Sequence, residues 1–194
     1  MSGAVAYARA LVDDPINREK NDFYPTWPAA TDALLRVEQF DGPIWEPACG
    51  EGDMSRQLEA AGYSVISTDL IDRAYGEPRI DFLLEHETRA PNIVTNPPFG
   101  LAKQFCSHAL ALTAPKGKVA MFLRLAFLEG IDRGTWLPTT PLKRVLVMSR
   151  RVPMQRGRLS QQGDGNGVMA FAWFVWDHAY WGEPTIGWLD WKAA

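Results

Sequence analysis

Short apolar runs alternate along this chain with longer stretches in which apolar residues recur every three or four positions. The apolar runs that we interpret as strands are residues 43–46, 64–68, 92–95, 119–123, 143–149 and 169–176, and residues 79–83 are a further short strand or a strand end. The stretches that we interpret as helices are residues 4–12, 31–39, 54–61, 101–113 and 130–137. Strands that alternate with helices predict an α/β fold, in which a mainly parallel sheet is covered by helices on both faces.

Asn96-Pro97-Pro98-Phe99 directly follows the predicted strand at 92–95. Two consecutive prolines cannot continue a strand ladder, so the backbone leaves the sheet there and presents its last side chains above the sheet edge. The Asn96 side-chain oxygen and a prolyl carbonyl can accept hydrogen bonds from an exocyclic amine, and the Phe99 ring can stack on a base. An ordinary strand-ending turn explains the same four residues equally well. Their context has to decide between a turn and a base pocket.

A glycine-bearing loop, Glu46-Pro47-Ala48-Cys49-Gly50-Glu51-Gly52, joins the first predicted strand to a helix. Such a loop is typical of a nucleotide pocket, because glycine lets the backbone approach a ligand closely. The spacing is neither the dinucleotide pattern GxGxxG nor a phosphate loop. Asp69 ends the next strand, 19 residues beyond Gly50. An acid there is often a turn residue or a helix cap, but beside this loop we favour binding of ribose hydroxyls.

The composition bounds the class of protein. The chain has 194 residues, 46% of them hydrophobic, so it can build one full core. No apolar run approaches the roughly 20 residues that span a bilayer, and we expect a soluble cytoplasmic protein without a membrane partner. Cys49 and Cys106 are too few and too isolated for a disulfide framework or a zinc site, so we expect no metal. The net charge of -3 argues against indiscriminate coating of nucleic acid.

A basic segment lies between residues 143 and 158, where six Lys and Arg side chains occur without an acidic one. Ligands of an open α/β sheet bind beyond the carboxyl ends of its strands, where the glycine loop, Asp69, Asp81 and the Asn96 motif all lie. The strand at 143–149 leads to the same edge with Arg150, Arg151, Arg156 and Arg158. Charge clusters are often only solvated surface, but this position favours contact with a phosphate backbone.

Three of these segments resemble the motifs of a known enzyme family. Residues 46–52 and 96–99 look like motifs I and IV of S-adenosylmethionine-dependent amino-methyltransferases, and Phe23-Tyr24-Pro25-Thr26 is similar to motif X. The order X, I, IV is that of gamma-type DNA N6-adenine methyltransferases. Residues 123–130 and the Arg150-Arg151 strand end resemble small phage and prophage members. The resemblance covers most of the chain and implies a Rossmann-like class I methyltransferase fold with a seven-stranded sheet.

The resemblance also implies the cofactor, the partner and the site residues. It implies S-adenosylmethionine as methyl donor and duplex DNA as substrate, with the target adenine rotated out of the helix. The implied catalytic residues are Asn96, Pro97, Pro98 and Phe99. The implied cofactor-binding residues are Tyr24, Pro25, Thr26, Glu46, Pro47, Ala48, Gly50, Asp69, Leu70, Asp81, Phe82 and Asn96. Among these, Asp69 would bind the ribose, Asp81 and Phe82 the adenine, and the segments at 24–26 and 46–50 the methionine end.

Trp27 departs from the family, since many members have proline at this position. The connections between the predicted strands are short, so a separate target-recognition domain does not fit. We expect one methyltransferase domain over residues 1–194, with residues 1–30 as an N-terminal arm, acting as a monomer or weak dimer. Its sequence specificity would be short or relaxed, and a phage-derived protein would work in the cytoplasm of a bacterial host cell.

Two alternatives stay open. The same chemistry serves RNA adenine or a protein glutamine amide, because enzymes that methylate these acceptors share motif IV. A catalytically silent module that binds nucleic acid or cofactor would be a different class of protein, and an intact segment at 96–99 speaks against it.

Overall fold

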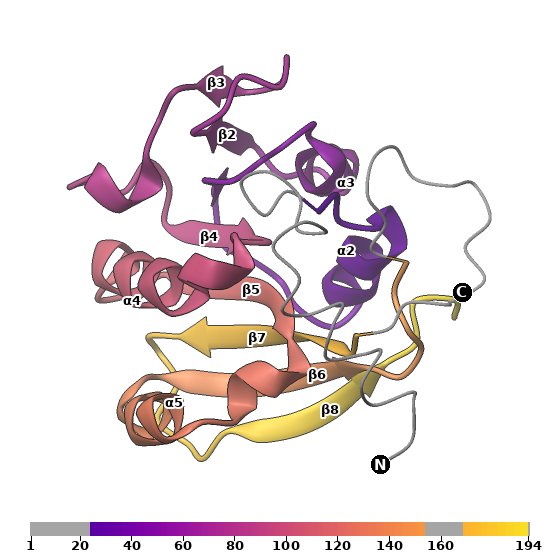
Figure 1. Ribbon diagram of the computed structural model, residues 1–194, viewed down its shortest axis with the longest axis vertical. Helices are drawn as coiled ribbons and strands as arrows, with labels where there is room; N and C mark the ends of the chain where they lie inside the picture. The colour runs from indigo at the N-terminus through magenta and orange to yellow at the C-terminus, as the bar shows by residue number, and fades with distance from the viewer. Residues whose placement is uncertain (1–23, 154–168, 194) are drawn as a thin grey trace, which may run out of the picture.

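The computed structural model describes residues 24–153 and 169–193, which form an eight-stranded sheet with helices on both faces (Figure 1). The strands are β1 (Ile44–Glu46), β2 (Val65–Asp69), β3 (Glu77–Pro78), β4 (Asn92–Thr95), β5 (Lys118–Arg124), β6 (Leu142–Met148), β7 (Phe171–Asp177) and β8 (Thr185–Leu189). The α-helices are α2 (Pro28–Leu35), α3 (Asp53–Ala60), α4 (Ala102–Thr113) and α5 (Ile131–Trp136). Short 3-10 helices are η2 (Phe82–Leu84), η3 (Phe99–Leu101), η4 (Leu125–Leu128) and η5 (Leu137–Thr139). None of the helices in this part of the chain is long and apolar enough to cross a membrane.

The strand order is β3-β2-β1-β4-β5-β7-β6-β8. Every pair is parallel except those of β7, which runs antiparallel to both β5 and β6. The mainly parallel α/β sheet that the sequence predicts is therefore confirmed. Because β1, β2, β4 and β5 run in the same direction, their carboxyl ends meet at one edge, and the loops that leave them come together there.

Both faces of the sheet are buried, as the alternation along β5 illustrates. Val119, Met121 and Leu123 pack into the cluster that includes α4, while Ala120 and Phe122 pack into the cluster that includes α2 and α3. Successive side chains of a strand point to opposite faces, so a continuous apolar run is what a strand covered on both sides requires. This is why β5 appears in the sequence as a continuous apolar run.

The sheet has eight strands rather than the predicted seven. Neither β3 nor β8 coincides with a predicted run, and β8 pairs in parallel with β6 at one edge of the sheet. Its run contains Gly187, and Ile186 and Trp188 are 60% and 70% exposed. An edge strand that is open on one side lacks the continuous apolar run that predicts a strand covered on both faces.

Two element boundaries also differ from the prediction. The run at 79–83 follows the end of a strand and does not form one itself, because β3 ends at Pro78, Arg79 has a left-handed backbone with φ 65°, and η2 begins at Phe82. The helix predicted at 31–39 is α2, which begins at Pro28. Proline suits the first helical turn, since its φ is fixed and its missing N–H has no partner there anyway. The predicted helix at residues 4–12 lies outside the described residues.

Candidate functional site

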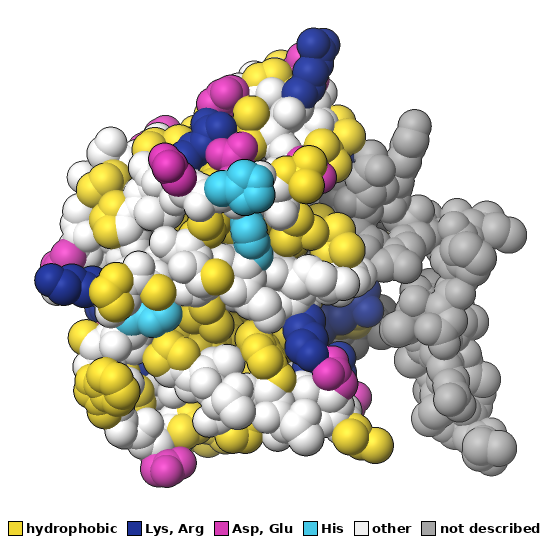
Figure 2. Space-filling model, turned by 90° about the vertical axis from the view of Figure 1, so that its left-hand side faces the viewer, with side chains coloured by type: hydrophobic (Ala, Val, Ile, Leu, Met, Phe, Trp, Pro, Cys, Tyr) yellow, Lys and Arg dark blue, Asp and Glu magenta, His cyan; other side chains and the backbone are white. Residues whose placement is uncertain are grey.

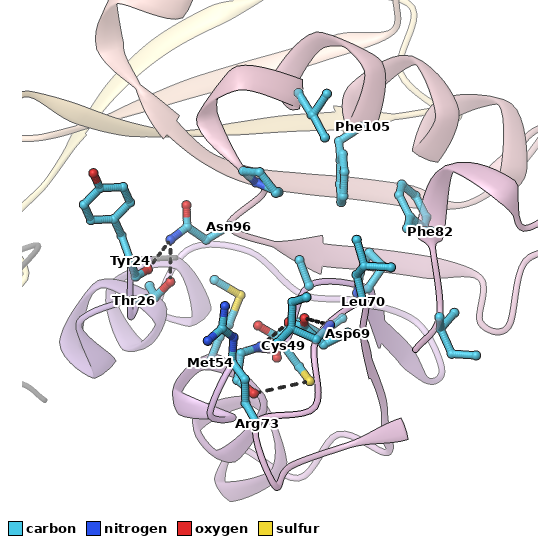
Figure 3. A pocket seen from close by; sticks show the side chains of 18 of the residues that line it. Tyr24, Thr26, Cys49, Met54, Asp69, Leu70, Arg73, Phe82, Asn96 and Phe105 are labelled. Carbon is cyan, nitrogen blue, oxygen red and sulfur yellow. Dashed lines mark hydrogen bonds between the residues drawn. The ribbon is translucent and has the colours of Figure 1, made fainter. Parts of the chain in front are cut away.

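A pocket lies at the carboxyl ends of β1, β2 and β4 (Figure 3). Its lining includes every residue predicted to bind the cofactor: Tyr24, Pro25, Thr26, Glu46, Pro47, Ala48, Gly50, Asp69, Leu70, Asp81, Phe82 and Asn96. Residues that the sequence reasoning missed also line it: Cys49, Asp53, Met54, Ile71, Arg73, Ile80, Leu83, Leu101 and Phe105. Most of these lie within a few residues of a predicted one. Residues as far apart in sequence as Tyr24 and Phe105 therefore line one pocket.

The glycine loop is fixed by Asp69. Its Oδ2 accepts a hydrogen bond from the Gly50 N–H at 2.8 Å, and its Oδ1 accepts one from the Ile71 N–H at 2.8 Å. Gly50 and Gly52 have left-handed φ angles of 57° and 85°, which other residues rarely adopt. A carboxylate oxygen has a second lone pair, so Asp69 can hold the loop and still accept from a ligand hydroxyl. The turn role that an acid often has here and the predicted ribose role are thus compatible.

Glu46 is a buried carboxyl group in the pocket wall. It is 2% exposed, and the Ser55 hydroxyl donates a hydrogen bond to it. Ser55 in turn lies 2.7 Å from the Ser67 hydroxyl. Burial raises the pKa of Glu46 well above its usual value, although the hydrogen bond from Ser55 opposes this rise. A positively charged ligand group beside Glu46 would favour its ionised form.

The other end of the pocket is aromatic. Phe82 is 2% exposed and packs edge-on against Trp45, with ring centroids 5.2 Å apart. Its ring also contacts that of Phe105, with centroids 4.9 Å apart and planes at 40°. Asp81 begins η2 by accepting a hydrogen bond from the Leu83 N–H at 3.0 Å. The rings and the short helix form a fixed apolar wall that suits a planar ligand ring.

The side-chain amide of Asn96 has a fixed orientation. Its Nδ2 donates to the Tyr24 carbonyl and to the Thr26 hydroxyl, both at 3.0 Å. A carbonyl can only accept a hydrogen bond, so the nitrogen and not the oxygen of the amide must face Tyr24. The opposite atom, Asn96 Oδ1, is buried and has no hydrogen-bond partner among the described residues. Each such buried acceptor costs about 1–3 kcal/mol, which a ligand N–H would recover.

Phe99 belongs to an aromatic stack beside this amide. Its ring stacks on Tyr24 with centroids 5.1 Å apart and planes at 17°. The guanidinium of Arg124, at the end of β5, lies 4.2 Å from the ring centroid of Phe99. Neither partner was predicted to contact Phe99. Pro98 lines the pocket, whereas Pro97 is buried and lies outside its lining.

The described residues of the basic segment lie at opposite ends of β6. Lys143 and Arg144 lie where β6 begins and pair with the buried acids Asp177 and Glu38, so they are structural.

Figure 2 shows the side of the molecule at the left of Figure 1, where Lys and Arg side chains are scattered rather than gathered into a patch.

Beyond the carboxyl end of β6, the described residues include two further arginines, Arg150 and Arg151. Arg150 Nε donates to Asp190 Oδ1 and Oδ2 at 2.8 and 2.9 Å, so an acid compensates its charge. Arg151 is exposed at the same strand end. Arg156 and Arg158, also predicted to bind nucleic acid, lie outside the described residues.

This sheet, with its pocket beyond the carboxyl ends of the parallel strands, is the Rossmann-like fold of class I methyltransferases. A protein from Listeria monocytogenes assigned as a class I S-adenosylmethionine-dependent methyltransferase has TM-score 0.63 and 12% identity over 98% of this chain and 73% of its own. A protein from Pyrococcus horikoshii assigned as an RNA methyltransferase has TM-score 0.60 and 17% identity over 91% of this chain and 98% of its own.

A third similar structure, assigned as the modification subunit of a type I restriction enzyme from Vibrio vulnificus, has TM-score 0.56 and 14% identity. That match covers 94% of this chain and 49% of the subunit. No family model matches the chain, and no curated protein matches it either. At these identities the likeness defines the fold of this chain.

Proposed function

We propose that this protein transfers a methyl group from S-adenosylmethionine to the N6 amine of adenine in DNA, with short or relaxed sequence specificity. The observation that carries the proposal is the buried Asn96 Oδ1, which lacks a partner among the described residues while Tyr24 and Thr26 occupy the amide nitrogen. The partner that fits this oxygen is an N–H donor, and an exocyclic amine provides one.

The lining of the pocket fits S-adenosylmethionine. The aromatic wall at Phe82 and Phe105 suits its adenine, the Asp69 carboxylate would accept hydrogen bonds from its ribose hydroxyls, and Glu46 is a buried acid suited to a cationic group. The compound, when bound, supplies a methyl group already activated by a sulfonium centre. The fold shared with class I methyltransferases supports the same choice.

The residues of the motif would position the acceptor. The lone pair of an adenine amine is delocalised into the ring, which makes the amine a weak nucleophile. Hydrogen bonds from the amine to Asn96 Oδ1 and to the Pro97 carbonyl would favour a more tetrahedral nitrogen, with its lone pair directed into the pocket. The stack of Tyr24 and Phe99 would hold the flipped base and exclude water from it.

DNA is the proposed acceptor because of the order of the motifs and the arginines after β6. Arg151 is exposed at the pocket edge of the sheet, and Arg156 and Arg158 follow it in sequence. Among the similar folds, the Vibrio vulnificus protein is assigned as the modification subunit of a type I restriction enzyme and the Pyrococcus horikoshii protein as an RNA methyltransferase. Both assignments are consistent with a nucleic-acid acceptor.

The proposal is tested with methyl-labelled S-adenosylmethionine and three separate acceptors: duplex DNA, RNA of the same sequence, and a mixture of proteins. We expect label in DNA, recovered as N6-methyladenine after digestion. Label in RNA alone would refute the choice of acceptor and keep the chemistry. Binding of S-adenosylhomocysteine without transfer to any acceptor would favour the silent module. Sequencing of the methylated positions on a long natural DNA would then define the specificity.

A further inference from the structure

Arg73 lies in the loop between β2 and β3, four residues beyond Asp69, and lines the pocket (Figure 3). Among the described residues that line the pocket, Arg73 is the only basic one, whereas four are acidic: Glu46, Asp53, Asp69 and Asp81. Sequence reasoning assigned no role to Arg73. The pocket therefore combines an acidic lining with one positive group.

We infer that Arg73 binds the carboxylate in the amino-acid portion of the methyl donor and so determines where that portion lies. This inference rests on the proposed function. S-adenosylmethionine has two positive groups, an ammonium and a sulfonium, and one negative group, the carboxylate. The acids of the lining match its positive groups and its hydroxyls, and the guanidinium matches its carboxylate. A guanidinium can hold a carboxylate through two parallel hydrogen bonds, which fixes the direction of the ligand as well as its position.

The place of Arg73 in the pocket agrees with this assignment. In Figure 3 its side chain extends toward Met54 and the side of Thr26, away from the aromatic end at Phe82 and Phe105. If the aromatic end takes the adenine, the amino-acid portion reaches the end where Arg73 lies. Burial raises the pKa of the Cys49 thiol to about 12, and the charge of Arg73 acts to lower it, as expected of a guanidinium close to the glycine loop.

The loop that carries Arg73 is held in place at both ends. At its start, the Ile71 N–H donates to Asp69 Oδ1. At its end, Gly76 has a φ of 66°, and an added Cβ would lie 2.6 Å from the Ser67 carbonyl oxygen and 2.9 Å from Cys49 Sγ. The Tyr75 hydroxyl donates to Glu59 at 3.2 Å. A loop fixed in this way positions the guanidinium before the ligand arrives, which reduces the entropic cost of binding.

A purely structural role would explain the same geometry, since one arginine could simply offset the charges of the surrounding acids. The two roles differ in what they predict for ligands with and without the carboxylate. We therefore compare S-adenosylhomocysteine with S-adenosyl-3-thiopropylamine, which keeps the adenosine, the thioether and the amine but lacks the carboxylate. Their dissociation constants are measured by calorimetry for the parent, Arg73→Met, Arg73→Lys and the control Arg79→Met. Arg79 is exposed directly after β3 and lies outside the pocket lining, so its variant removes the same charge nearby.

For Arg73→Met we expect the affinity for S-adenosylhomocysteine to fall on the order of 10- to 100-fold, the loss expected of a charge-assisted hydrogen bond. The affinity for the amine analogue should stay unchanged or rise, because a positive charge is removed near an ammonium. Arg73→Lys should recover part of the loss, and Arg79→Met should change both affinities little.

Equal weakening of both ligands by Arg73→Met would overturn the inference in favour of a structural role. Unchanged binding of S-adenosylhomocysteine, or a parent protein that binds both ligands equally well, would overturn it too while leaving the proposed function intact. A parent protein that binds neither ligand would refute the proposed function, and this inference with it.

Discussion

The side-chain amide of Asn96 donates a hydrogen bond to the hydroxyl of Thr26, with 3.0 Å between Nδ2 and Oγ1 and 70 residues between them in sequence. Thr26 is 5% exposed, so water has little access to replace it. The carbonyl of Tyr24 takes the second amide hydrogen at 3.0 Å. The segment at 24–26 therefore does more than line the pocket. By binding Nδ2 of the Asn96 amide, it leaves Oδ1 as the atom that can accept a hydrogen bond from a ligand.

Replacing Thr26 by Val keeps the shape of the side chain and removes the hydroxyl that holds Asn96. We expect kcat for methyl transfer to fall on the order of 10- to 100-fold, since a buried amide N–H left without its acceptor costs about 1–3 kcal/mol and loosens the amide. Thr26→Ser keeps the oxygen and should retain most of the activity. Steady-state kinetics of the two variants check this, and equal kcat values for Val and Ser would show that the hydroxyl does not orient Asn96.

Asn96→Ala removes the acceptor of the proposed target amine. We expect the dissociation constant of S-adenosylhomocysteine to change little while transfer falls by at least about 10²- to 10³-fold, as for other groups that act on the reacting atoms. Calorimetry and single-turnover transfer measure the two quantities separately. Parent-like transfer by this variant would contradict the role assigned to Asn96.

The arginines after β6 should differ in their contribution to DNA binding. Arg151 is exposed, whereas Asp190 already compensates Arg150. We expect Arg151→Gln to reduce the slope of log affinity against log salt by about 1, and Arg150→Gln to reduce it less. Joint replacement of Arg156 and Arg158 by Gln should also weaken binding and flatten the slope. Fluorescence anisotropy over a series of salt concentrations measures these slopes.

Arg144→Gln is the control for this series, because Arg144 lies at the opposite end of β6 and pairs with Glu38 at 3.3 Å. Its slope should equal that of the parent. If Arg151→Gln also leaves the slope unchanged, the basic segment is solvated surface rather than a DNA contact.

Gly117 and Gly134 should respond in opposite ways to replacement by Ala. A Cβ on Gly117 would overlap the carbonyl oxygen of Pro91 and crowd Thr113, so we expect a loss of at least about 2 kcal/mol in the free energy of unfolding. Gly134 lies within α5 with nothing within 4 Å of the added Cβ. There alanine should stabilise by about 0.5–1 kcal/mol. Denaturant unfolding of both variants measures the difference, and similar values for the two would contradict it.

Asp177 should contribute to the pH dependence of stability. Burial alone would raise its pKa, but the Lys143 ammonium, 3.0 Å from Oδ2, and the Ala179 N–H lower the pKa below its usual value. A lowered folded-state pKa stabilises the protein above the pKa of the unfolded chain, and this stabilisation is lost as the pH falls through the folded value. Asp177→Asn should therefore lower the free energy of unfolding at pH 7 and flatten its fall in acid.

The matched control for Asp177 is Asp41→Asn, at an exposed position. Urea unfolding at a series of pH values from 7 down to about 2.5 measures the effect. If the pH profile of Asp177→Asn runs parallel to that of the parent, the ion pair of Asp177 and Lys143 does not cause the loss of stability in acid.

The core of the fold could be predicted from local sequence. Val119 to Leu123 needs apolar side chains on both faces of a covered strand, the prolines after Asn96 must end β4, and Gly50 and Gly52 permit the left-handed turn of the pocket loop. Each of these constraints acts within a few residues, so it leaves a local pattern. The same patterns placed the loops on the edge where the pocket lies.

Other properties of the site exist only in three dimensions. The sequence names Asn96 but not the direction of its amide, which the carbonyl and hydroxyl of a segment 70 residues away decide. It shows Arg150 as a basic residue but not its pairing with Asp190, and Arg73 as a loop residue but not its place among the acids of the pocket. Hydrogen bonds and charges act through space, so their partners are set by how the strands bring distant loops together and leave no periodic pattern in the chain.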